Sequence, residues 1–172
     1  MNYRTRRWKY TDAEALHQSL NNIHVWEKIC DDVPFPFTKR DATSFIKRTT
    51  TEEERFDAYA IEVDNEICGG VYFTQANPPH TIIYKFNFWM APDFRNSTDF
   101  AEVVKDIVRH TFMHLPVIKM ICKVHSNDTQ AEEMLVQAGF KKEATIHKSV
   151  LKSGDIMDMH IYSCCEDMAN CF

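Results

Sequence analysis

One stretch of the sequence decides the fold: FNFWMAPDFRNSTDFAEVVKDIVRHTF, residues 86–112. It has the pattern of a strand, a turn with Pro92 and Arg95, and a helix with apolar residues at helical spacing. Such a unit can bind an anion, because the amides at a helix start point outward and the helix dipole favours negative charge there. The turn RNSTD has no glycine, however. The stretch therefore predicts either a phosphate site or a capped structural turn.

The composition indicates one globular domain over residues 1–172, with 44% apolar and 26% charged residues. The net charge of -5 argues against a nucleic-acid binder that relies on bulk positive charge. No apolar run approaches membrane-spanning length, and none follows the basic start MNYRTRRWKY, so neither a membrane contact nor a secretory signal is expected. The six cysteines form no C-x-x-C pair, which predicts reduced thiols in the cytoplasm.

Apolar periodicity predicts the element order β, α, α, β, β, β, α, β, α, β, β, which is an α/β domain with a mixed sheet. Two helices are expected after the N-cap candidates Asp12 and Thr38. The paired glycines Gly69 and Gly70 suggest a bulge or a close backbone approach, and Gly139 suits a left-handed helix end. The other elements are expected as strands at 3–9, 56–63, 67–75, 81–91, 117–124, 140–151 and 155–165, and as helices at 98–115 and 128–138.

Four motifs occur in an informative order. They are NEICGGVYF (65–73), FNFWMAPDFR (86–95), AEVVKDIVRHTF (101–112) and VHSNDTQAEEMLVQAGFKKEA (124–144). Together they resemble the GNAT superfamily of acyl-CoA-dependent N-acetyltransferases, and most of all its branch that acetylates ribosomal-protein N-termini and spermidine. The resemblance covers nearly the whole chain. It implies a mixed, mostly antiparallel sheet of six to seven strands flanked by about four helices.

The resemblance also implies a site for acetyl-CoA as the co-substrate. In this family the central and late strands separate, and the pantetheine arm pairs with free backbone groups like an added strand. The pyrophosphate binds to amides of the turn and of the helix start. The cofactor-binding residues implied in this way are Trp89, Met90, Ala91, Arg95, Asn96, Ser97, Thr98, Asp99, Phe100 and Asp128.

The sequence departs from the family pattern at several of these positions. Asn96 and Thr98 fill the two glycine positions of the pyrophosphate loop. Asp99 adds a negative charge beside the expected pyrophosphate, although it could instead cap the helix, as Ser97 or Thr98 could. Asp128 stands where the family has asparagine, and Leu135 where many members have a tyrosine acid. A standard acid for the departing thiolate is therefore missing.

Two residues are candidates for the general base. His125 at the end of the late strand has a suitable intrinsic pKa, and Glu62 could face the acceptor side. Each has a structural alternative, a strand-end histidine without a catalytic role and a solvated surface carboxylate. His110 and His114 have the spacing of metal ligands, but they lack the glutamate of H-E-x-x-H and a third ligand, so no metal is expected.

Two functional hypotheses remain open. The first is an N-acetyltransferase that moves an acetyl group from acetyl-CoA to a primary amine by direct attack in a ternary complex. The acceptor could be a peptide N-terminus, a polyamine or another small amine, and no motif identifies it. The second is a non-catalytic GNAT-fold binding module with a lost or weakened CoA site. A homodimer is plausible by resemblance alone.

Overall fold

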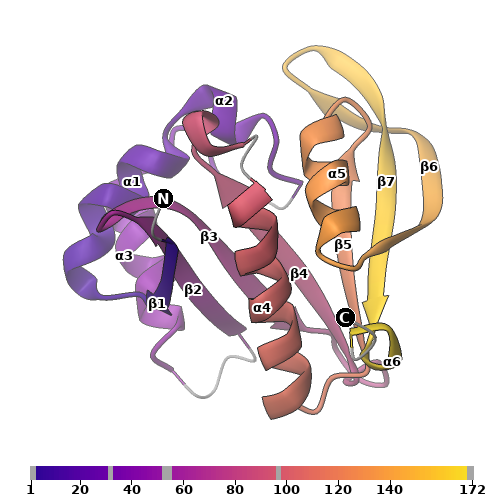
Figure 1. Cartoon of the computed structure of the whole chain (residues 1–172). Helices are drawn as coiled ribbons and strands as arrows, with labels where there is room; N and C mark the ends of the chain where they lie inside the picture. Colours follow the sequence, from indigo (N-terminus) through magenta and orange to yellow (C-terminus); the bar gives the residue numbers. More distant parts are fainter. Residues whose placement is uncertain (1–2, 31–32, 52–55, 96–97, 170–172) are drawn as a thin grey trace.

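The computed structural model describes residues 3–30, 33–51, 56–95 and 98–169. Its centre is a seven-stranded sheet in the order β1-β2-β3-β4-β5-β7-β6 (Figure 1). Of the described strand pairs, only β4 and β5 run parallel, which confirms the mixed, mostly antiparallel sheet. The strands are β1 (Tyr3–Arg7), β2 (Phe56–Val63), β3 (Glu66–Gln75), β4 (Ile83–Met90), β5 (Lys119–His125), β6 (Lys141–Lys152) and β7 (Asp155–Cys165).

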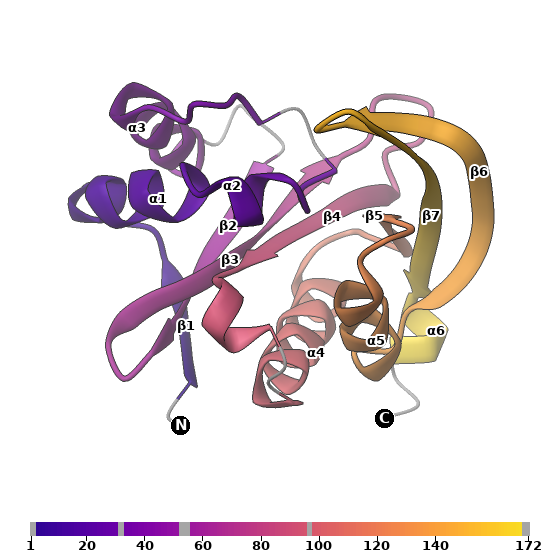
Figure 2. The same ribbon diagram turned by 90° about the horizontal axis from the view of Figure 1, so that it is seen from above.

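Helices cover both faces of the sheet. Figure 2 shows α1, α2 and α3 on one face and α4 and α5 on the other. The four predicted helices are present, and two helices of four residues, α2 and α6, add to them. No helix among the described residues is long and apolar enough to cross a membrane. The bounds are α1 (Ala13–Leu20), α2 (Ile23–Trp26), α3 (Lys39–Arg48), α4 (Thr98–His114), α5 (Thr129–Gln137) and α6 (Glu166–Ala169), with 3-10 turns η1 (Tyr10–Asp12) and η2 (Pro92–Phe94).

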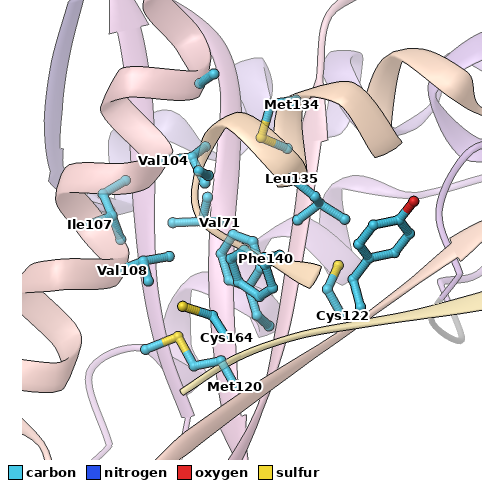
Figure 3. Close-up of a cluster of buried hydrophobic side chains, with 14 of the residues drawn as sticks. Val71, Val104, Ile107, Val108, Met120, Cys122, Met134, Leu135, Phe140 and Cys164 are labelled. Carbon is cyan, nitrogen blue, oxygen red and sulfur yellow. The ribbon is translucent and has the colours of Figure 1, made fainter. Parts of the chain in front are cut away.

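Each face of the sheet has its own apolar core. In Figure 3, side chains of α4 and α5 meet Phe140 and Val71 in the larger core. The second core lies under α1 and α3 and includes Trp8 and Trp89. Successive β4 side chains alternate between the two, because side chains along a strand point to opposite faces. Phe86 therefore packs in the first core and Trp89 in the second.

The glycine pair in β3 allows a close approach, as predicted. A Cβ at Gly70 would lie 2.5 Å from the indole ring of Trp89, and one at Gly69 would lie 2.5 Å from the Trp89 carbonyl oxygen. The predicted bulge is also present, as a register shift between Ile61 and Glu62 of β2. Only glycine can occupy positions with so little room, so the pair fixes how closely the Trp89 indole lies against the sheet.

Both predicted caps lie at the N-cap positions, Asp12 before α1 and Thr38 before α3, but only Thr38 caps its helix through its side chain. The Thr38 hydroxyl accepts from the Asp41 amide, and the Asp41 carboxylate accepts from the Thr38 amide, which is a reciprocal capping box at the start of α3. The Asp12 carboxylate makes no capping bond to α1. It accepts instead from the Lys9 amide and from Arg6, because a partly buried guanidinium offers a carboxylate stronger hydrogen bonds than an amide does.

Candidate functional site

The central feature of the site is a gap between β4 and β5. These parallel strands pair only where residues 83–85 face residues 119–121, and they separate beyond that point. A hollow of ≈ 20 Å³ lies between Asn87–Met90 of β4 and Cys122–Val124 of β5, and we call it the slot. The predicted separation of the central and late strands is therefore present.

Successive residues of β4 direct their backbone N–H and C=O groups to opposite sides of the strand, and this alternation determines which groups face the slot. The carbonyl of Ile83 accepts from the Ala76 amide, and the amide of Ala91 donates to the Cys68 carbonyl, so odd-numbered residues bond toward β3. The backbone groups of successive residues alternate between the two neighbours of a strand, and those of Phe88 and Met90 consequently point into the slot. Of the predicted cofactor residues, Trp89 directs its backbone groups to β3 instead, and so does the amide of Ala91, whereas the Ala91 carbonyl accepts from the Phe94 amide. Phe88 was not predicted.

An ion pair crosses the mouth of the slot. The Arg95 guanidinium donates to both oxygens of Asp128, at 2.6 and 2.5 Å, and its Nε donates to Gln130 at 3.2 Å. The two charged side chains are 12% and 4% exposed. Asp128 also caps α5 by accepting from the Ala131 amide. The structure thus brings two predicted cofactor residues together, with their charges directed at each other.

The turn that follows is only partly described. Asn96 and Ser97 lie outside the described residues, and so does the N-cap of a helix that begins at Thr98. Asp99 is exposed in the first turn of α4, inside the helix rather than at its cap. Phe100 is fully buried in the larger core, so only its backbone could meet a ligand. Pyrophosphate binding by this turn stays a prediction.

A second hollow, the aromatic cavity, lies between α3 and the sheet and measures ≈ 220 Å³. It shares Ile29, Phe88 and Trp89 with the slot, so the two meet at the end of β4. Most of its wall is apolar or aromatic. The residues that line it are Leu20, Ile29, Val33, Pro34, Phe37, Asp41, Ser44, Phe45, Arg48, Phe56, Tyr72, Phe88 and Trp89.

Ring contacts make this wall rigid. Phe45 of α3 packs edge-on against Phe56, Tyr72 and Trp89, with ring centroids 5.3, 5.8 and 5.9 Å apart. Trp8 stacks on Trp89 at 5.8 Å from the other side. Edge-to-face and offset stacked rings are the favoured aromatic geometries, so the wall is held in place before any ligand arrives.

The charged groups of the cavity come from α3. Asp41, Ser44 and Arg48 are spaced so that they share one side of the helix. Hydrogen bonds from the Thr38 hydroxyl and amide lower the pKa of Asp41, so its carboxylate is charged at neutral pH. The Arg48 guanidinium lies 4.3 Å from the centre of the Phe56 ring. The cavity thus carries one negative and one positive group on an otherwise largely apolar wall.

His125 lies behind this site. It is 2% exposed, and its Nδ1 is 3.1 Å from the carbonyl oxygen of Glu27, beyond α2. Burial and the nearby Lys152 lower the pKa of His125. Among the described residues that line the slot and the aromatic cavity, His125 is absent. Its role as a base stays a prediction.

Glu62 is held in a buried ion-pair network. Its carboxylate accepts from Nε of Arg6 at 2.6 Å, and the same guanidinium donates to Asp12. The hydrogen bonds that Arg6 donates to Asp12 and Glu62 raise its pKa, against the effect of burial. Glu62 is 6% exposed, so the alternative of a solvated surface carboxylate is wrong. It too is absent from the described lining of both hollows.

The residues that sequence reasoning missed are mainly the cavity walls. The sequence analysis does not name Phe45, Phe56 and Tyr72 as site residues, yet they line a hollow that adjoins the slot. Phe56 and Tyr72 face Thr74 and Ala58 in the strand register, and α3 brings Phe45 onto them, so no local signal in the sequence marks this wall. His110 and His114 stack on each other at 4.0 Å, and no group of metal-ligating side chains occurs among the described residues.

Comparisons with known proteins agree with this geometry. A family model for the acetyltransferase (GNAT) domain matches residues 4–141. No curated protein matches the chain in sequence. Similar solved structures include a Vibrio cholerae spermidine N-acetyltransferase in complex with CoA and spermine, with 14% identity, a TM-score of 0.81 and 98% of each chain covered.

Two further structures are similar at the same low identity. RimL, a ribosomal-protein alpha-N-acetyltransferase in complex with coenzyme A, is 15% identical, with a TM-score of 0.81 and coverage of 96% of this chain and 94% of that one. A GNAT-family acetyltransferase from Bacillus anthracis is 15% identical, with a TM-score of 0.78 and coverage of 97% and 96%. These structures show a shared fold. Because the family match spans most of its length, the chain belongs to the GNAT acetyltransferase family.

Proposed function

We propose that the protein is an N-acetyltransferase that moves an acetyl group from acetyl-CoA to a primary amine. The observation that carries this proposal is the junction between two hollows at the end of β4. The slot presents unpaired strand edges, and the aromatic cavity opens onto it at Ile29, Phe88 and Trp89. Two substrates entering from the two sides would meet there, and direct transfer requires such a meeting.

The slot suits the pantetheine arm of acetyl-CoA by its backbone. An amide-containing chain can add to the free edge of a strand, and the groups of Phe88 and Met90 offer that edge. At ≈ 20 Å³ the slot is narrow, so β4 and β5 would have to move apart for the arm to enter. Several solved relatives contain CoA or acetyl-CoA, which supports the same choice of co-substrate.

When bound, acetyl-CoA supplies an activated thioester. The amine nitrogen bonds to its carbonyl carbon, the carbon–sulfur bond breaks, and the thiol leaves with a proton. The wall of Phe88 and Trp89 would hold the amine against the slot and exclude bulk water. The described residues that line the two hollows include two carboxylates, Asp41 and Asp128, and both already accept hydrogen bonds. Water is then the simplest final acceptor of the ammonium proton.

Titration calorimetry with acetyl-CoA on the purified chain tests the proposal. We expect a micromolar dissociation constant for acetyl-CoA and much weaker binding of S-acetylpantetheine, which lacks the pyrophosphate that the turn after β4 would bind. A thiol-release assay with a panel of amines then measures transfer. If no binding occurs at millimolar acetyl-CoA, the enzyme proposal fails. The second candidate, a non-catalytic binding module, would then be favoured, and the Arg95–Asp128 ion pair across the slot is the observation that supports it.

A further inference from the structure

We propose that the aromatic cavity takes a primary amine on an apolar body about the size of a phenyl ring, and that it rejects polyamines. This inference rests on the acetyltransferase function proposed above and specifies its acceptor. The features that carry it are the volume and lining of the cavity, its charge balance, and its position beside the slot.

The volume and lining suit an apolar ring. The cavity measures ≈ 220 Å³, and its wall includes six aromatic residues. An engineered apolar cavity of about 150 Å³ in another protein is large enough to bind benzene. Because Phe45, Tyr72 and Trp89 are locked by mutual ring contacts, the space exists before a ligand enters it. A ring-bearing amine would therefore gain apolar contact at little cost in ordering the wall.

The charge balance disfavours a polyamine. The described lining holds one carboxylate, Asp41, and one guanidinium, Arg48, so it has no net negative charge. A polyamine carries several ammonium groups, and each one that leaves water needs a carboxylate or a hydrogen-bond acceptor in exchange. Besides Asp41, the described side chains of the wall offer the hydroxyls of Ser44 and Tyr72, which are too few for several ammonium groups. A single ammonium needs only one such exchange, and Asp41 can attract it as it enters the cavity.

The apolar wall also favours the reactive form of such an amine. Only the neutral amine can attack a thioester, and removal from water lowers the pKa of an ammonium group. The cavity meets the slot at Phe88 and Trp89, so the nitrogen would be desolvated next to the reaction centre. This effect reduces the need for a dedicated base. It works best for one charge on an apolar body, because the other charges of a polyamine would hold water in place.

Calorimetry of amine binding to the whole chain, without acetyl-CoA, tests the inference. Phenethylamine is the probe, spermidine the competing class, and the tripeptide Phe-Gly-Gly tells a peptide N-terminus from a free small amine. We expect phenethylamine to bind at least tenfold more tightly than spermidine. Tighter binding of the tripeptide than of phenethylamine would support the same recognition of an amine on an aromatic body, and it would indicate that a peptide N-terminus supplies that amine.

A matched pair of variants locates the binding. Ser44 and Thr43 are neighbouring exposed residues of α3, and of these two Ser44 alone lines the cavity. We expect Ser44→Leu to weaken phenethylamine binding at least tenfold and Thr43→Leu to change it less than twofold, with similar melting temperatures for both. Absence of phenethylamine binding, spermidine binding as tight or tighter, or an unchanged affinity in Ser44→Leu would each overturn the inference. Because these binding measurements need no acetyl-CoA, failure of this inference can be distinguished from failure of the proposed function.

Discussion

The slot and the aromatic cavity meet at the same three residues, yet they are built in opposite ways. The slot comes from backbone directions: two strands separate, and the phase of β4 turns the groups of Phe88 and Met90 into the gap. The cavity comes from side chains that lock one another in place. The slot is narrow and crossed by an ion pair, whereas the cavity is preformed and roughly ten times larger in volume. Under the proposed function, the acceptor side is therefore preformed, and the cofactor side has to open.

The largest expected effect is that of a methyl group at Gly70. A Cβ there would lie 2.5 Å from the Trp89 ring, so Gly70→Ala must push the indole toward the cavity. We expect a loss of about 3 kcal/mol in the free energy of unfolding, as is typical of overpacking, measured by urea denaturation. Amine binding should fall with it, because Trp89 is a wall of the cavity.

Gly154→Ala is the control for this variant. Gly154 has a positive φ of 87°, but no atom lies within 4 Å of the place that an alanine methyl group would take there. It should lose about 1 kcal/mol through backbone strain and keep its amine binding. If the two variants changed amine binding equally, the close contact of Trp89 with Gly70 would not be what positions the cavity wall.

Removal of the charge of Asp128 tests whether the ion pair keeps the slot closed. Asp128→Asn leaves the buried Arg95 without its counter-charge, and we expect a loss of about 2 kcal/mol in the free energy of unfolding. The released guanidinium can then meet the phosphates of acetyl-CoA, so affinity by calorimetry should rise severalfold. Glu133→Gln removes an exposed charge from the same helix and should change neither quantity. Weaker acetyl-CoA binding in Asp128→Asn would show instead that Asp128 supports the cofactor site.

This difference in construction also explains what the sequence could predict. Residues 86–95 have a periodic pattern and a turn, so the strand and its end were predicted correctly, whereas the separation from β5 was implied by the family resemblance. The direction of the backbone groups along β4 was not predicted, because it depends on the register with β3. The prediction therefore named Trp89, whereas the backbone groups of Phe88 face the slot. The aromatic cavity arises where α3 packs on β2, β3 and β4, and contacts between distant segments leave no local motif.

The arginines that bond to Glu62 and Asp128 could not be predicted from the sequence either. Glu62 and Asp128 were chosen for their positions along the chain, and each is bonded to an arginine far away in sequence. A single sequence does not show which cation a carboxylate will meet, because the pairing depends on the full sheet order. By contrast, the capping box of Thr38 and Asp41 is local, and the cap at Thr38 was predicted from the residue alone.

A smaller effect is expected at His125. Its ring bonds to Glu27, two residues before Ile29, which lines both the slot and the aromatic cavity. Its ring contacts the Glu27 carbonyl, so His125→Gln should loosen this segment and cost about 1 kcal/mol of stability. Burial and Lys152 lower the pKa of His125 in the fold, and the unfolded chain therefore binds a proton more readily. The contribution of neutral His125 to the stability of the fold is present above the unfolded pKa of about 6.5 and is lost as the pH falls below that value.

Two measurements separate this structural role from catalysis. Urea denaturation between pH 7 and pH 5 should show a smaller loss of stability in His125→Gln than in the wild type. The pH profile of acetyl transfer should keep its shape, with a change of less than about threefold in rate. A profile that loses an inflection near neutral pH would instead assign His125 as the base.

The smallest expected effect is at Asp41, the carboxylate at the rim of the cavity. Asp41→Asn keeps a side-chain oxygen for the Thr38 cap but removes the negative charge that attracts the ammonium as it enters the cavity. Because the site is partly open to water, an exposed charge pair contributes little, and KM for phenethylamine should rise only about threefold with kcat unchanged. Asp155→Asn, at an exposed turn between β6 and β7, should leave KM unaltered. A large fall in kcat in Asp41→Asn would mean that this carboxylate takes the amine proton, and desolvation by the aromatic wall would then not be enough to activate the acceptor.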